Sequence, residues 1–314
     1  MLNRFIMTLL VTLLASCATP STPRVAMEMG TAGAGGAFSP YGEAFAKVVA
    51  TNSHVDIKPR VTKGSNENID LMVAGTTALG LVNLGPALDA MTGKGAWSSK
   101  PVTGLRAIAP MYETPFHLVA LRSSGISTLG GLAGKRVGAG PKGGPGEIFL
   151  AGLLAETGVS ATLVNGDPAD HGRQLLAREI DALWIGAGTP VPVIKGIADQ
   201  HDATVFGLTA QEVSAFRKRF PYAAPNTIGA LTYRGQTTPV QTVAIWNFVV
   251  GRADLPEREV KAIALAAMKN HKEMAALFGP AFATQAGNAQ ANGVMPFHPG
   301  ALAALRELGV LLNP

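Results

Sequence analysis

The sequence contains almost no cysteine. Cys17 is the only one in 314 residues, so no disulfide can form within the chain. A chain of this kind must be stabilised by its own hydrophobic core. Its length is sufficient, because a chain of about 300 residues buries about 75% of the surface that it exposes when unfolded. The length also favours two domains.

Charged residues are scarce as well, at 15% of the chain. The formal net charge is +5, and the basic residues form neither a run nor a stripe interleaved with aromatic residues. Nucleic-acid binding needs such a basic patch, so we do not expect it here. A small anionic ligand fits the mild positive excess better. Hydrophobic residues make up 47% of the chain, which excludes a disordered protein.

The common motifs of enzymes and metal sites are missing too. The six histidines are scattered and show no metal-ligand spacing. No Gly-x-Ser-x-Gly motif is present, and the single thiol lies in the N-terminal leader. Glu67, Lys142 and Glu147 are the only acid or base candidates close to a glycine turn, and each has a structural explanation at a helix start. We therefore predict no enzyme activity, no catalytic residue, no metal and no cofactor.

The leader has the organisation of a secretory signal peptide. Arg4 supplies the positive charge, residues 5–15 are apolar residues and threonines, and the run ends in Leu-Ala-Ser before Cys17. Cysteine at the cleavage site resembles a bacterial lipoprotein signal, in which Cys17 would become the lipidated first residue. The alternative is a membrane-spanning anchor, but the run is about half of the ~20 residues that a spanning helix needs. We predict a signal peptide over 1–16 and a lipidated tether over 17–24, which places the protein outside the cytoplasm.

Beyond the tether, strands alternate with helices, which predicts an α/β fold with largely parallel sheets. The same unit of strand, glycine-rich turn and helix occurs twice. These units predict two similar lobes, one formed by residues 25–115 with 250–314 and the other by residues 116–249. The chain is expected to cross between the lobes along apolar strands near 116–121 and 243–250.

Capping residues predict several helix boundaries. Ser39 is expected to cap the first helix and Ser65 the second. A third helix should open at Pro145 and end before Gly158. Two more predicted helices, the longest one and the terminal one, cover residues 256–278 and 297–312.

Three predicted helix starts carry glycine, over 30–39, 64–68 and 140–147. A helix start presents free N–H groups and partial positive charge, and glycine lets an anion approach the backbone. Open α/β sheets hold ligands at such turns. Neither glycine-rich turn matches a nucleotide-binding motif. The alternative is that each is only a tight turn, since many turns need glycine.

Five segments, taken in order, resemble the TAXI family of solute-binding proteins, the extracytoplasmic receptors of TRAP-type transporters. They cover nearly all of the chain beyond the tether. The first contains Gly30 to Gly42, the second Thr62 to Ile69 and the third Leu132 to Glu147. The last two run from Asp181 to Pro190 and from Thr227 to Val243.

The resemblance implies a two-lobed periplasmic-binding-protein fold, type II-like, with a ligand cleft between the lobes. It also implies a monomer that holds a small organic anion such as an amino acid, a dicarboxylate or a 2-oxoacid. Trp184 and Tyr222 are each either core residues or part of the cleft, and Ser65 and Asn68 are either ligand contacts or a cap and its partner. The ligand-binding residues implied are Thr31, Gly33, Gly35, Gly36, Phe38, Ser65, Asn68, Lys142, Gly143, Gly144, Thr189 and Tyr222.

The chain departs from the family pattern at several hydroxyl positions. It has Ala34, Ala37 and Phe38 in the first turn, and Gly144, Pro145 and Gly146 where the family has Ser-Gly-Thr. Loss of polar partners predicts a ligand that is less polar or larger than glutamate. The predicted function is a receptor that delivers its ligand to a TRAP-type permease. The alternatives are a periplasmic sensor subunit signalling to a kinase, an enzyme on the same fold, and a structural lipoprotein.

Overall fold

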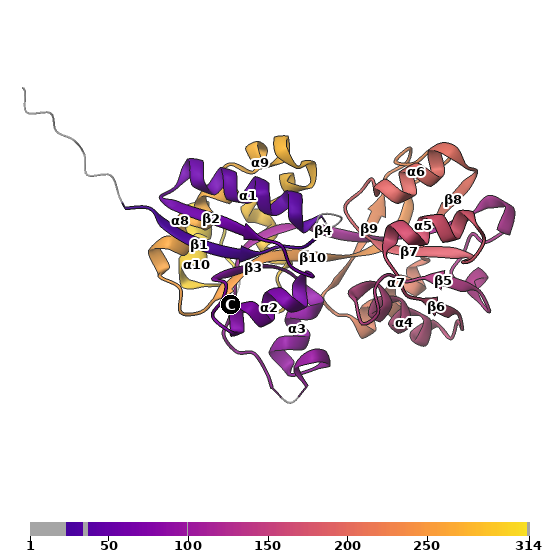
Figure 1. Ribbon diagram of the computed structural model, residues 1–314, viewed down its shortest axis with the longest axis horizontal. Coiled ribbons are helices and arrows are strands. Elements are labelled where there is room, and N and C mark those ends of the chain that lie inside the picture. Colours follow the sequence, from indigo (N-terminus) through magenta and orange to yellow (C-terminus); the bar gives the residue numbers. More distant parts are fainter. Residues whose placement is uncertain (1–22, 34–36, 99, 313–314) are drawn as a thin grey trace, which may run out of the picture.

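The computed structural model describes residues 23–33, 37–98 and 100–312. The predicted leader and Cys17 lie outside these residues, as do Gly35 and Gly36 of the first glycine turn. The fold is α/β, with two lobes joined by long strands (Figure 1). This confirms the predicted α/β class and two lobes. The expectation of largely parallel sheets is wrong, because the two strands that join the lobes pair antiparallel with their neighbours.

The first lobe, lobe I, contains three parallel strands. They are β1 (Val25–Gly30), β2 (Val55–Arg60) and β3 (Leu79–Asn83), with β1 between the other two. β2 is the edge strand of the sheet, as Pro59 predicts, because proline cannot donate a hydrogen bond to a further strand.

Two long strands connect the lobes. β4 (Leu105–Leu121) pairs with β10 (Val240–Arg252) up to Pro115, and from Phe116 onward it pairs with strands of the second lobe. β10 pairs with β9 (Ala223–Ile228) up to Ile245 and with β3 from Asn247 onward. The predicted lobe boundaries, 115/116 and 249/250, therefore fall within these two strands.

The second lobe, lobe II, continues the sheet with four shorter strands. β5 runs parallel to β6 and β7, whereas β7 and β8 run antiparallel to β4. The four strands are β5 (Arg136–Gly138), β6 (Thr162–Val164), β7 (Ala182–Gly186) and β8 (Ala203–Phe206).

Helices cover both faces of the lobe I sheet. One face carries α1 (Phe38–Asn52), α8 (Glu257–Lys269), α9 (His271–Leu277) and α10 (Pro299–Glu307). The other carries α2 (Ser65–Val73) and α3 (Leu84–Thr92). Lobe II contains α4 (Pro145–Thr157), α5 (Pro168–Leu176), α6 (Pro192–Gln200) and α7 (Ala210–Arg219). Single 3₁₀ turns are η1 (Gly95–Trp97), η2 (Arg122–Ser124), η3 (Gly130–Leu132), η4 (Gly279–Ala283) and η5 (Ala286–Ala291).

One hydrophobic core runs from the α2–α3 side of lobe I into lobe II. At its centre Phe116 stacks on Trp184 with ring centroids 4.7 Å apart, and Phe149 meets Phe116 edge-on at 5.4 Å. Trp184 is only 1% exposed. Of the two possibilities left open by the sequence, Trp184 is therefore a core residue.

Four predicted helix boundaries are wrong, including those of the terminal helix, which spans Pro299–Glu307 instead of 297–312. α1 starts at Phe38 with Ala37 as its N-cap, so Ser39 lies inside the helix. Ser65 is the first residue of α2, whose N-cap is Gly64 with a φ of 103°. The predicted long helix over 256–278 is broken at Asn270, where the backbone leaves helical geometry (φ −108°, ψ 28°) and α8 gives way to α9.

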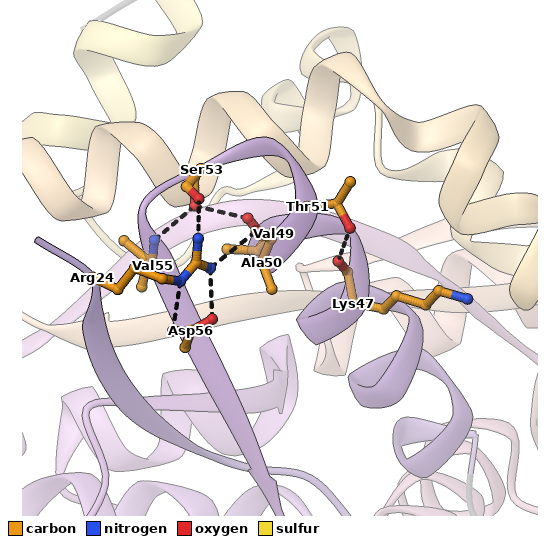
Figure 2. A network of polar contacts seen from close by, with 8 residues as sticks. All are labelled: Arg24, Lys47, Val49, Ala50, Thr51, Ser53, Val55 and Asp56. Atoms are coloured by element: carbon orange, nitrogen blue, oxygen red, sulfur yellow. Dashed lines mark hydrogen bonds and ion pairs between the residues drawn. The ribbon is translucent and has the colours of Figure 1, made fainter. Parts of the chain in front are cut away.

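Arg24 fixes the point where the chain enters lobe I. Figure 2 shows its guanidinium against Asp56 of β2, to which it donates two hydrogen bonds of 2.8 and 2.6 Å. It also donates to the carbonyls of Ala50 and Ser53 at the end of α1. A cation at a helix C-terminus is favourable, so Arg24 joins β2 to α1.

Candidate functional site

The three parallel strands of lobe I end at the same edge of the sheet, and a helix starts close after each. Thr31 follows β1 there and is 2% exposed. Both its N–H and its hydroxyl donate to the carbonyl of Arg60 at the end of β2, each at 2.9 Å. The single hydroxyl proton of Thr31 is thereby used, so toward a ligand this oxygen can only accept a hydrogen bond.

Asn68 joins these strand ends from inside α2. Its side-chain N–H groups donate to the carbonyls of Thr31 and Leu81, both at 2.8 Å, and its oxygen accepts from the Thr62 hydroxyl at 2.7 Å. The side chain is fully buried. Asn68 thus holds the turn after β1 against β3, while its predicted contact with a ligand stays a prediction.

Ser65 has a hydroxyl that is available to a ligand. Its oxygen accepts from the N–H of Asn83 at 3.1 Å, and the part of the chain that the structure describes offers no acceptor for its proton. Ser65 is half-buried at the first turn of α2. It can therefore donate to an anion at the sheet edge.

Asn83 and Asn247 were missed by the sequence reasoning. The Asn83 oxygen accepts from the N–H of Gly85 at 3.0 Å, and its amide group donates to Asn247 at 3.1 Å. Asn247 in turn donates to the carbonyl of Tyr112 in β4. This buried amide pair links the start of α3 to both connecting strands. The only sequence signal was an asparagine at the end of a buried strand.

The glycine turn of lobe II lies before α4 and is open. Gly140 and Gly143 have positive φ values of 81° and 70°, and a Cβ on either would meet no atom within 4 Å. The N–H of Gly143 donates to Glu147, and that of Gly144 donates to the Pro141 carbonyl at 2.9 Å. An anion at this turn would compete with these acceptors. Lys142, in contrast, is exposed and forms no ion pair among the described residues.

The starts of α2 in lobe I and α4 in lobe II are stabilised in the same way. The N–H of Lys63 donates to Glu67 at 2.7 Å, just as the N–H of Gly143 donates to Glu147. Both glutamates are the third residue of their helix, where a carboxylate satisfies a free N–H group and interacts favourably with the helix dipole. Their positions therefore have a structural cause.

The loop after β7 carries Thr189, which is exposed. Beneath it lies His117 of β4, whose Nε2 is 3.4 Å from the Thr189 hydroxyl. The hydroxyl of Tyr233 accepts from the N–H of Val191 at 2.8 Å and holds the same loop. Burial lowers the pKa of His117 to about 4, so the ring is neutral at neutral pH.

Contacts bridge the lobes at two places. A Cβ built on Gly85 of α3 would lie 2.8 Å from the Phe149 ring of α4 and 3.0 Å from the Tyr222 hydroxyl. On the other side, a Cβ on Gly188 would lie 3.4 Å from Pro280 of η4. Since α4 begins at Pro145, four residues before Phe149, its start lies about 6 Å along the helix from the Gly85 contact.

The remaining predicted residues lie as follows. Tyr222 is half-buried, and burial, together with the nearby charge of Asp89, raises the pKa of its phenol. Gly33 is exposed, and a Cβ there would meet no atom within 4 Å. Phe38 is half-buried and packs on the lobe I core. Ser65 accepts a hydrogen bond from Asn83, and the Tyr222 hydroxyl lies near Gly85, two residues further along the chain, while Gly35 and Gly36 lie outside the described residues.

Two surface hollows lie elsewhere and contain no predicted ligand residue. One, of about 520 Å³, is lined by His54 and the first turns of α8. The other, of about 730 Å³, lies between the end of α2 and Arg252. Among residues 23–33, 37–98 and 100–312, no cluster of histidine, cysteine or acidic residues could hold a metal ion.

The model of one protein family matches residues 29–309, which is almost the whole of the described chain. The chain belongs to the NMT1-like family. No helix within the described ranges of this NMT1-like chain is long and apolar enough to cross a bilayer.

Solved structures with the same fold are two-lobed periplasmic binding proteins. MatC (Rpa3494) from Rhodopseudomonas palustris, with bound malate, has a TM-score of 0.60 and 13% identity over 92% of this chain and 98% of its own. A TctC solute-binding protein from Polaromonas, without ligand, has a TM-score of 0.56 and 15% identity over 83% and 89%. The periplasmic binding protein BugD has a TM-score of 0.54 and 12% identity over 93% and 100%. At these identities the likeness establishes the fold of this NMT1-like chain.

Proposed function

We propose that this NMT1-like protein is an extracytoplasmic solute-binding receptor of the TAXI type. It captures a small organic anion between its lobes and delivers the anion to a TRAP-type membrane permease. The observation that carries this proposal is the joined edge of lobe I. There Thr31, Asn68 and Ser65 tie three strand ends together, and the adjoining start of α3 touches α4 and Tyr222 of lobe II.

The ligand is a small carboxylate, for which amino acids, dicarboxylates and 2-oxoacids are the candidates. The Ser65 hydroxyl and the Lys142 ammonium supply a donor and a positive charge from opposite lobes. Malate bound to MatC, a protein of the same fold, is consistent with this class of ligand. Glu67 and Glu147 already hold backbone N–H groups, which supports a structural role for them over acid–base catalysis.

The proposal includes a lipid anchor. Acylation of Cys17 would attach the protein to a membrane, and residues 17–24 would separate the anchor from lobe I. The receptor would work as a periplasmic monomer that meets its permease at the membrane surface.

Thermal unfolding of the purified protein tests the ligand class. A ligand that binds only the folded state raises stability by RT ln(1 + [L]/Kd), about 2.7 kcal/mol at a hundred times Kd. Amino acids, dicarboxylates and 2-oxoacids are screened, with glucose as an uncharged control. At least one carboxylate should raise the melting temperature, whereas glucose should not. No shift with any carboxylate contradicts the proposal.

A matched pair of variants localises the effect. Lys142→Ala should reduce the shift caused by the active compound, because it removes the positive charge at the lobe II turn. Lys135→Ala removes the same charge from the other end of β5 and should leave the shift unchanged. Equal effects of the two variants would place the ligand away from the turn.

A further inference from the structure

We infer that Gly85 is a positioning residue for lobe closure. Because it lacks a side chain, lobe II can rest directly against the start of α3. A side chain at this position would hold the lobes apart. Closure as a ligand-capturing motion rests on the proposed function, whereas the separation of the lobes can be measured without any ligand.

The contact at Gly85 is too close for any other residue. A Cβ would lie 2.8 Å from the end of the Phe149 ring and 3.0 Å from the Tyr222 hydroxyl, and both belong to lobe II. The backbone itself does not demand glycine, because Gly85 is the second residue of α3 and has no positive φ. Alanine is a better helix former than glycine, and the closest atoms that disfavour it here belong to the opposite lobe, although Asn83 Oδ1 of lobe I would also lie 3.3 Å from the Cβ.

Phe149 cannot move aside easily. It is 2% exposed and meets the rings of Phe116, Phe216, Phe220 and Tyr222 at centroid distances of 4.9 to 6.3 Å. A close-packed aromatic cluster resists overpacking because its side chains occupy well-defined rotamers. An added methyl group at Gly85 would therefore displace lobe II as a body.

Gly85 is also fixed firmly on its own side. Asn83 accepts a hydrogen bond from the Gly85 N–H and donates to Asn247 of β10. Asn247 donates to the Tyr112 carbonyl and the Thr114 hydroxyl of β4. Gly85, against which lobe II rests, is thus linked to both connecting strands. Any rotation of one lobe relative to the other must take place about these strands.

Small-angle X-ray scattering of the ligand-free protein tests the inference. Gly85→Ala should give a larger radius of gyration than the wild type, and Gly85→Leu a larger one still. Gly196→Ala, in α6, is the matched control, because a Cβ there would meet no atom within 4 Å. Gly196→Ala should leave the radius unchanged. A folded Gly85→Ala protein with the wild-type radius of gyration overturns the inference.

Restoring space in lobe II should reverse the effect. Phe149→Leu shortens the side chain opposite Gly85, so the double variant with Gly85→Ala should return toward the wild-type radius. If Gly85→Ala alone does not fold, recovery of folding in the double variant supports the same contact. Failure of Phe149→Leu to recover either compactness or folding counts against it.

Discussion

The two glycine turns each follow a strand and precede a helix, but they are held in different ways. In lobe I the turn after β1 is tied by buried side chains, with Thr31, Thr62 and Asn68 joining β1, β2 and β3. In lobe II the turn before α4 is anchored at Gly140, whose N–H donates to the buried His171, whereas its outer residues Lys142 and Gly143 are exposed. Lobe I thus offers a preformed surface, whereas the lobe II turn can adjust when the lobes meet.

The two lobes nevertheless share one feature, a glutamate near the start of a helix. The start of α2 in lobe I and the start of α4 in lobe II both use a glutamate, Glu67 or Glu147, to satisfy an N–H group of the preceding turn. The difference in rigidity therefore arises from the residues that surround the helix starts and not from the caps.

The largest expected effect is at Asn68. Asn68→Ala should lower the free energy of unfolding by about 3 kcal/mol, because it removes the Asn68 donors to the buried carbonyls of Thr31 and Leu81 and one acceptor of the Thr62 hydroxyl. Urea unfolding measures the change. Asn66→Ala, on the exposed side of the same helix, should change stability by less than about 0.5 kcal/mol. A loss below about 1 kcal/mol for Asn68→Ala would remove the basis for calling lobe I preformed.

Lowering the pH should reduce the free energy of unfolding, because His117 in lobe II becomes protonated. The unfolded state takes up a proton near the ordinary pKa of 6.5, whereas the folded state does so only near 4. Stability from this group is therefore complete above pH 6.5 and is lost as the pH falls toward 4. At about 1.4 kcal/mol for each pKa unit, the loss is about 3 kcal/mol.

Urea unfolding between pH 7 and pH 4 measures this loss. His117→Gln should flatten the pH dependence relative to the wild type, and His201→Gln, an exposed control in the same lobe, should keep it. The same pH dependence in both variants would show that His117 is not the source.

Two glycines of the first turn should respond differently to alanine. At Gly30 a Cβ would lie 2.3 Å from the Asn68 oxygen, so Gly30→Ala should cost about 2 kcal/mol of stability. At Gly33 a Cβ would meet no atom within 4 Å, so Gly33→Ala should cost less than about 0.5 kcal/mol. Equal costs, measured by thermal unfolding, would mean that the turn is not anchored at Gly30.

The smallest effect is expected at the shared caps. Glu67→Gln and Glu147→Gln keep an acceptor oxygen but remove a negative charge near the proposed site. An anionic ligand from the melting screen should then bind about two- to fivefold more tightly, which corresponds to about 0.3–1 kcal/mol. Calorimetric titration measures this change. Weaker binding in either variant would indicate that the carboxylate contacts a positive group of the ligand.

Local sequence patterns predicted much of lobe I. The strands β1 and β3 are short, mostly apolar runs that end at Gly30 and Asn83, residues that are typical of turns. α3 was missed, because Leu84 follows the buried strand without a polar interruption. The seventeen residues of β4 were predicted only from Phe116 onward, since Arg106 and Glu113 interrupt the apolar pattern.

The site was less accessible to sequence reasoning. The glycine turns could be located, because glycine and the following helix signal are local features. The hydrogen-bond partners could not, because Asn83 meets Asn247 across 164 residues of chain. Phe149 and Gly85 likewise meet only once both lobes are folded.

Arg24 bears on how the whole molecule would be held at a membrane. β1 begins at the end of lobe I that is remote from lobe II (Figure 1). If Cys17 carries the proposed lipid anchor, a tether from Cys17 to Arg24 could reach at most roughly 25 Å. A pulling force on this tether would act on the Arg24–Asp56 ion pair and on the contact of Arg24 with the end of α1. It would not act directly on β4 and β10. Lobe I would then be the stationary half, and lobe II the half that swings.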